Sequence, residues 1–72
     1  MSGLPQLAGA RIARALRRAG FADVSQRGSH LKLRHPDGRT VIVPMHKTVA
    51  RGTLGSILKQ ANLEADNFRK LL

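Results

Sequence analysis

The residues most able to carry chemistry lie in one short stretch, residues 27–34, with the sequence RGSHLKLR. Leucine alternates there with polar residues. An extended strand would therefore place His30, Lys32 and Arg34 on one face and the two leucines on the other. Histidine is the side chain that titrates nearest neutral pH, and here it is predicted to share a face with two fixed cations. This combination suits the holding and cutting of a phosphate backbone.

The composition indicates a polyanionic partner. The chain has 13 Lys and Arg residues against 4 Asp and Glu residues, a formal net charge of +9 on 72 residues. So large an excess favours nucleic acid, although an acidic protein would also fit. Phe21 and Phe68 are the only aromatic residues, so the chain lacks the surface on which many RNA-binding domains stack bases. We therefore expect nucleic acid to be held mainly through its backbone.

Three strands are predicted in succession, at residues 21–26, 30–34 and 40–43. The sequence His35-Pro36-Asp37-Gly38 is typical of a tight turn between the second and third strands. Because both connections are short, the strands are predicted to form an antiparallel meander. Phe21 and Val24 are the core candidates of the first strand.

Helices are predicted before and after the three strands in the sequence. They cover residues 8–19, a segment that opens at Gly52 and Thr53 after the loop 45–50, and residues 64–72. Gly20 is expected to end the first helix. Apolar residues recur at helical spacing in both longer helices, and the first carries four arginines on its opposite side, namely Arg11, Arg14, Arg17 and Arg18.

The order of elements predicts an α+β fold that is double-stranded-RNA-binding-domain-like, α-β-β-β-α, with its helices on one face of a three-stranded antiparallel sheet. The opposite sheet face would stay open. We expect residues 1–72 to form a single domain. Residues 1–11 contain no apolar run suited to a signal peptide or a membrane span, so we expect a cytoplasmic protein without membrane association.

Several blocks of the sequence, in their order and spacing, resemble the HicA family of mRNA interferase toxins. The blocks are Ala19-Gly20-Phe21, Arg27-Gly28-Ser29-His30, Val43-Pro44-Met45-His46, Gly52-Thr53-Leu54 and Ile57-Leu58-Lys59-Gln60-Ala61. The resemblance covers nearly the whole chain. It departs from the usual family pattern at Leu31, Gly55 and Asn62, none of which belongs to the histidine block.

The resemblance implies an endoribonuclease with a catalytic histidine in the Gly-Ser-His block, here His30. It also implies a HicB-type antitoxin as the protein partner and mRNA as the substrate. Operator DNA would be reached only indirectly, through the antitoxin.

The other two histidines have less clear roles. His46 could close a loop by a hydrogen bond or act as a second acid or base, and we favour the structural role. His35 lies at the predicted turn and is expected to be solvated surface. His30 and His35 should point to opposite faces, and four acidic residues are few for a metal-dependent nuclease. We therefore predict no metal site and no cofactor.

The favoured mechanism is metal-independent RNA cleavage by acid–base chemistry. His30 would take the proton from a ribose 2′-OH or give one to the leaving oxygen. The predicted RNA-binding residues are Arg27, Ser29, Lys32, Arg34, Lys47 and Arg51. One alternative is a non-catalytic RNA-binding module with the same fold, and another is a protein whose basic surface only docks an acidic partner. A pure binder has no need of a titrating side chain on its cationic face.

Overall fold

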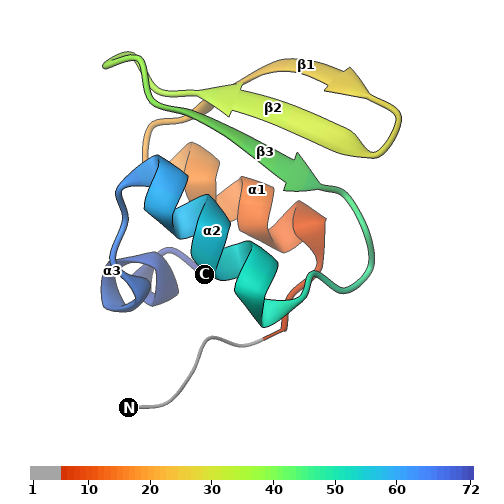
Figure 1. The fold of residues 1–72 in the computed structure, drawn as a ribbon. Coiled ribbons are helices and arrows are strands. Elements are labelled where there is room, and N and C mark those ends of the chain that lie inside the picture. The colour runs from red at the N-terminus through yellow and green to blue at the C-terminus, as the bar shows by residue number, and fades with distance from the viewer. Residues whose placement is uncertain (1–5) are drawn as a thin grey trace.

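The computed structural model describes residues 6–72, so part of the N-terminal stretch considered above lies outside the described residues. The elements are α1 Gly9–Arg18, β1 Ala22–Arg27, β2 His30–Arg34, β3 Thr40–Pro44, α2 Arg51–Ala61 and α3 Ala65–Lys70 (Figure 1). This order confirms the predicted α-β-β-β-α pattern, with small differences at the ends of the elements. Within residues 6–72, no helix is long and apolar enough to cross a membrane.

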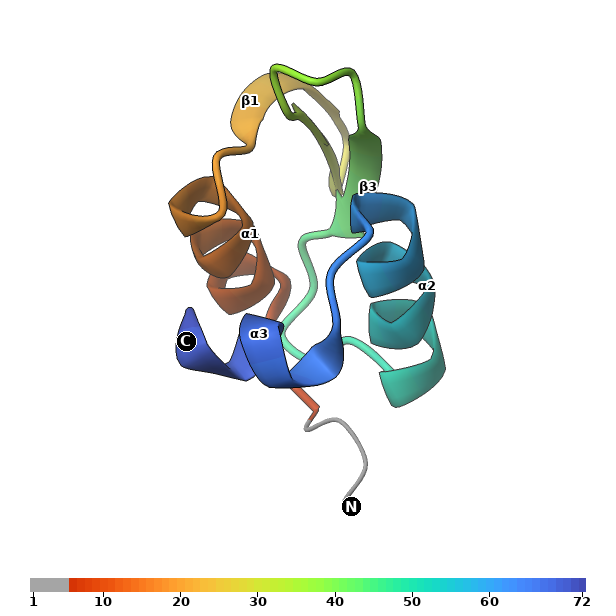
Figure 2. The ribbon, with the colours of Figure 1, turned by 90° about the vertical axis from the view of Figure 1, so that its left-hand side faces the viewer.

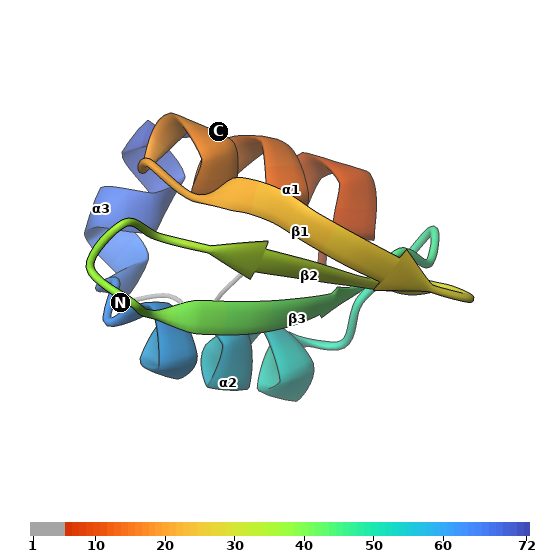
Figure 3. The same cartoon turned by 90° about the horizontal axis from the view of Figure 1, so that it is seen from above.

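The strands form one antiparallel sheet in the order β1-β2-β3, as expected for a meander. All helices lie on the same side of this sheet, with α1 and α2 beneath it and α3 farther away (Figures 2 and 3). The predicted fold class is therefore confirmed. The other sheet face is covered by no element of residues 6–72.

The core lies between the sheet and the helices, and its residues follow the periodicities of the elements. Alternate residues of β2 and β3 are buried, namely Leu31, Leu33, Val41 and Val43. The helices bury residues at helical spacing, among them Ile12, Leu16, Leu54 and Ile57. Phe21 is also buried, as predicted, and α3 contributes Phe68. Gly20 follows α1 with a φ of 103°, which fits its predicted role in ending that helix.

The prediction that Val24 belongs to the core is wrong. Val24 is 47% exposed, because the register of β1 against β2 shifts at this residue. Asp23 pairs with Leu33 and Ser25 pairs with Lys32, so one extra residue of β1 is accommodated as a β-bulge. Every residue of β1 is exposed, so this edge strand contributes no fully buried residue to the core.

The prediction that His35 is solvated surface is also wrong. Its side chain is only 23% exposed, and its ring packs edge-on against Phe21 at 5.2 Å between centroids. Arg39 lies over the Phe21 ring and donates a hydrogen bond to the Ala61 carbonyl oxygen at the end of α2. Hydrogen bonds from Arg39 lower the pKa of Asp37 to about 2. The β2–β3 turn is thus anchored to the helical layer.

Helix α1 begins at Gly9, against the backbone that follows β3. A Cβ atom on Gly9 would lie 2.1 Å from the carbonyl oxygen of Pro44 and 2.8 Å from the Cα atom of Met45. The Gly9 amide donates a hydrogen bond to the His46 carbonyl oxygen at 2.9 Å. Because the neighbouring atoms are backbone, no side-chain rotation can make room for a larger residue.

Replacing Gly9 by alanine is expected to destabilise the fold by about 1–3 kcal/mol, as overpacking usually does. In a domain of this size each kcal/mol changes Tm by about 4–8 °C, so thermal unfolding followed by circular dichroism would measure the effect. Gly55→Ala is the matched control, because Gly55 lies within α2 and has no atom within 4 Å of an added Cβ. The control is expected to raise stability by about 0.5–1 kcal/mol. Equal melting temperatures for the two variants would contradict this account of Gly9.

Candidate functional site

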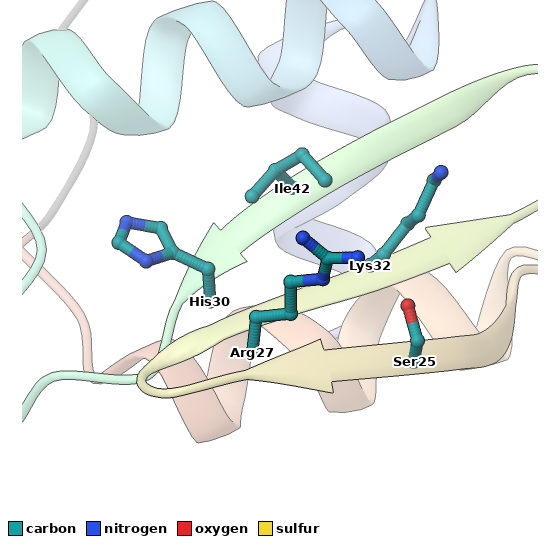
Figure 4. Close-up of a pocket in the computed structure, with 5 residues that line it drawn as sticks. All are labelled: Ser25, Arg27, His30, Lys32 and Ile42. Atoms are coloured by element: carbon teal, nitrogen blue, oxygen red, sulfur yellow. The ribbon is translucent and has the colours of Figure 1, made fainter.

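A pocket lies on the open face of the sheet. Its lining comes from all three strands and consists of Ser25, Arg27, His30, Lys32 and Ile42. Figure 4 shows these side chains extending over the same face. These side chains lie together because the strand pairing places them opposite one another, and opposite residues on neighbouring strands lie side by side. Arg27 pairs with His30, and Lys32 lies between Ser25 and Ile42.

His30 is placed at the edge of this pocket by the hairpin that joins β1 to β2. Gly28 and Ser29 form its two-residue loop, and Gly28 adopts a φ of 56°. His30 is the first residue of β2 and is exposed, while the next residue, Leu31, is buried in the core. The predicted alternation of this strand is therefore confirmed. A nucleic-acid strand on the open face would have direct access to the imidazole.

A second imidazole, that of His46, lies close to His30. Their ring centroids are 6.4 Å apart and their planes are inclined by 69°. The His46 Nε2 atom is 3.1 Å from the Ser29 hydroxyl oxygen, a hydrogen-bonding distance. The Met45 amide donates to the Ser29 carbonyl oxygen at 2.6 Å, so the loop after β3 is tied to the β1–β2 hairpin by two contacts.

The open face of the sheet is positively charged, and no carboxylate in the described part of the chain neutralises its cations. Within residues 6–72, no carboxylate pairs with Arg27, Lys32 or Arg34. Three of the four acidic residues pair with arginine elsewhere, in the pairs Asp23–Arg17, Asp37–Arg39 and Asp66–Arg69. A phosphate group of RNA could therefore pair with these cations without displacing a carboxylate.

Two of the α1 arginines have structural partners on the helical side. Arg17 pairs with Asp23 at 2.8 Å, and its hydrogen bond lowers the pKa of that carboxyl group. Arg18 donates to the Leu71 carbonyl oxygen at 2.7 Å. These two side chains connect α1 to β1 and to the C-terminal segment. None of the α1 arginines lines the pocket.

The other predicted RNA-binding residues are not among those that line the pocket. Arg34 stands at the far end of β2 and donates to the Thr40 hydroxyl at 3.3 Å. Lys47 is exposed in the loop after β3, and Arg51 is exposed as the first residue of α2. Ser29 is half-buried in the hairpin, where His46 is its side-chain partner.

The sequence analysis missed two residues that line the pocket. Ile42 lies between the buried Val41 and Val43 and is 41% exposed, so strand alternation alone could have placed it on the open face. Ser25 could not be placed in this way. Regular alternation from the buried Phe21 would put Ser25 on the core side, but the bulge at Val24 turns it to the open face.

The arrangement offers proton transfer and charge stabilisation from organic side chains. His30 supplies an acid–base group, and Arg27 and Lys32 supply fixed positive charge beside it. Within residues 6–72, no three His, Cys, Asp or Glu side chains gather as a metal ion would require. The pocket residues are cations, a histidine, a hydroxyl and an aliphatic side chain, which is not a donor set for a divalent metal ion.

Comparison with known families gives a match over most of the chain. Residues 9–63 match the family described as HicA toxin of bacterial toxin-antitoxin. The matched range begins at Gly9 and includes the whole sheet, the pocket and α2. The chain has no match among curated proteins.

Proposed function

This chain belongs to the HicA family of toxins from bacterial toxin–antitoxin systems, and we propose on that basis that it is a metal-independent endoribonuclease that cuts mRNA. The observation that carries the proposal is the position of His30. It lies on an open, cationic sheet face, in one pocket with Arg27 and Lys32. A histidine among unpaired cations suits an enzyme that binds phosphate and moves a proton next to it.

In the proposed reaction, the ribose 2′-oxygen loses its proton and attacks the adjacent phosphorus. The bond from phosphorus to the 5′-oxygen breaks, and that oxygen leaves with a proton. The products are a 2′,3′-cyclic phosphate and a 5′-hydroxyl end. His30 performs one of the two proton transfers, and Arg27 and Lys32 stabilise the negative charge that builds on the phosphate oxygens.

Recognition of RNA is proposed to rely on its backbone. The pocket contains no aromatic side chain other than the histidine, so base stacking contributes little. Arg34 extends the cationic face along β2 and would contact a neighbouring phosphate. Lys47 and Arg51 are exposed in the β3–α2 loop and at the start of α2, so they would contact RNA that continues beyond the open face. Contacts of this kind bind tightly and read little sequence.

The proposed protein partner is a HicB-type antitoxin, as family membership suggests. The net charge of +9 would also favour binding of an antitoxin with an acidic surface. Contact with operator DNA is proposed to occur only through this partner.

The test is incubation of the purified protein with a defined RNA in the presence of EDTA. Cleavage is expected to continue, because the proposed mechanism uses no metal ion, and the products should carry 2′,3′-cyclic phosphate and 5′-hydroxyl ends. Loss of cleavage on chelation, restored by an added metal ion, would refute the metal-independent mechanism. Binding without cleavage would favour the alternative of a non-catalytic RNA-binding module.

A further inference from the structure

The reaction proposed above needs two proton transfers on opposite sides of one phosphorus atom. One proton leaves the 2′-oxygen and another reaches the 5′-oxygen. General acid–base catalysis requires each group to lie within hydrogen-bonding reach of its own oxygen, about 2.6–3.2 Å. His30 can serve one oxygen during the attack, so the other transfer calls for a second group or for water.

His46 has the position that such a second group needs. It is exposed in the loop after β3, outside the pocket lining but next to His30. Its ring centroid is 6.4 Å from that of His30. The planes are inclined by 69°, so the two rings meet edge to face and lie close enough to act on one phosphodiester group.

The position of His46 is fixed by the fold. Its carbonyl oxygen accepts the Gly9 amide at 2.9 Å, and the preceding residue, Met45, is bonded to the hairpin at Ser29. The ring itself is held through Nε2 by the Ser29 hydroxyl at 3.1 Å. The start of α1 and the β1–β2 hairpin therefore hold the backbone at His46, and within residues 6–72 the Ser29 hydroxyl alone holds the ring.

The choice of serine as the partner matters for proton transfer. A hydroxyl can donate to a bare ring nitrogen and accept from a protonated one, so its bond to Nε2 survives either protonation state of the ring. The Nδ1 atom is then left to exchange a proton with RNA. A partner that could only donate or only accept would favour one protonation state and oppose the other.

We propose that His46 is the second acid–base group of the ribonuclease, paired with His30, and that Ser29 is its positioning residue. One imidazole takes the 2′-hydroxyl proton as the new bond to phosphorus forms. The other, protonated, gives its proton to the 5′-oxygen as that bond breaks. This inference rests on the proposed ribonuclease function and adds to it the residue that completes the proton balance.

The test compares two RNA substrates of the same sequence, one with the ordinary 5′-oxygen and one with sulfur in that bridging position. A thiolate leaves without a proton, so the sulfur substrate needs no general acid. On ordinary RNA, His30→Gln and His46→Gln should each slow cleavage by about 10²–10⁴-fold, the usual contribution of such a group. On the sulfur substrate, only one of the two variants should recover to within a few-fold of the wild type, and that variant identifies the acid.

The controls separate catalysis from loop structure. Gln at position 46 can still hydrogen-bond Ser29, so a purely structural role predicts little loss on either substrate. Thr48→Ala changes an exposed residue of the same loop and should cut like the wild type. Ser29→Ala should slow the enzyme less than His46→Gln, and it should recover on the sulfur substrate only if His46→Gln does.

Two results would overturn the assignment of His46. One is a His46→Gln variant that cuts ordinary RNA at the wild-type rate. The other is a pair of variants that respond alike to the sulfur substrate, since both could not then hold different roles. If the wild-type protein cuts neither RNA, the ribonuclease function itself fails and the assignment fails with it, which is a separate and recognisable outcome.

Discussion

Alanine in place of His30 is expected to reduce RNA cleavage by about 10²–10⁴-fold, the range that a positioned acid–base group supplies. The fold should be unaffected, because His30 is exposed on the open sheet face and its removal leaves no cavity in the core. Cleavage rates on a defined RNA would be measured together with circular dichroism spectra and melting temperatures.

His35→Ala is the matched control for this experiment. His35 packs against Phe21 at the other end of β2 and takes no part in the pocket. Its removal should lower the melting temperature while the folded protein still cuts RNA. A folded His30→Ala variant that cuts at the wild-type rate would show that the catalytic group lies elsewhere.

A single 2′-deoxyribose at the cleavage site is expected to stop cleavage at that position. The proposed nucleophile is the 2′-oxygen, and the substitution removes it while leaving the phosphates unchanged. Chain scission at that position would be followed by gel electrophoresis, with the all-ribose RNA as the control. Continued cutting next to the deoxyribose would mean that water, and not the ribose, attacks phosphorus.

The same uncleavable RNA allows binding to be measured alone. Log affinity against log salt should fall with a slope of about −0.7 per phosphate contact for a single strand. Lys32→Ala should make the slope shallower by about one contact. Arg14→Ala, an exposed change on α1 on the helical side of the sheet, should matter less. A larger effect at Arg14 would place the RNA along the helices.

Much of the fold was predictable because its signals are local. The leucines of β2 alternate with polar residues, and this pattern alone placed His30 and Lys32 together on the open face. Helical spacing identified the buried stripes of α1 and α2, and the sequence after Arg34 identified the turn. The meander followed from short connections. Each of these inferences needed only residues close together in the chain.

The errors arose where distant residues decide the outcome. Val24 is apolar and lies in a strand, yet its exposure depends on the register against β2, where one extra residue is accommodated. His35 lies in a turn, yet its ring packs against Phe21, which precedes the neighbouring strand β1. Composition and spacing within one segment carry no information about such pairings.

In the candidate site, too, local sequence predicted some features, while others depend on residues far apart in the chain. His30 could be chosen from its own strand, whereas the contact of Ser29 with His46 joins two loops that are far apart in sequence. The proximity of the two imidazoles is likewise a product of the hairpin and of the β3–α2 loop. The sequence therefore could not decide the role of His46, which is argued from contacts that only the folded chain makes.

The exposure of every residue in β1 has a consequence for the local stability of the pocket. This strand is held by its backbone pairing with β2 and by the Arg17–Asp23 pair at the surface, and none of its residues belongs to the buried core. Segments with few buried contacts open at a lower free energy than the core does, and amide hydrogen exchange measures that difference. Opening of β1 alone would carry Ser25 and Arg27 away from the pocket while His30 stayed on a packed strand. The two cations beside the histidine thus lie on strands of unequal local stability. Lys32 is on β2, which is packed on the core, and Arg27 is on β1, which is expected to open at the lower free energy.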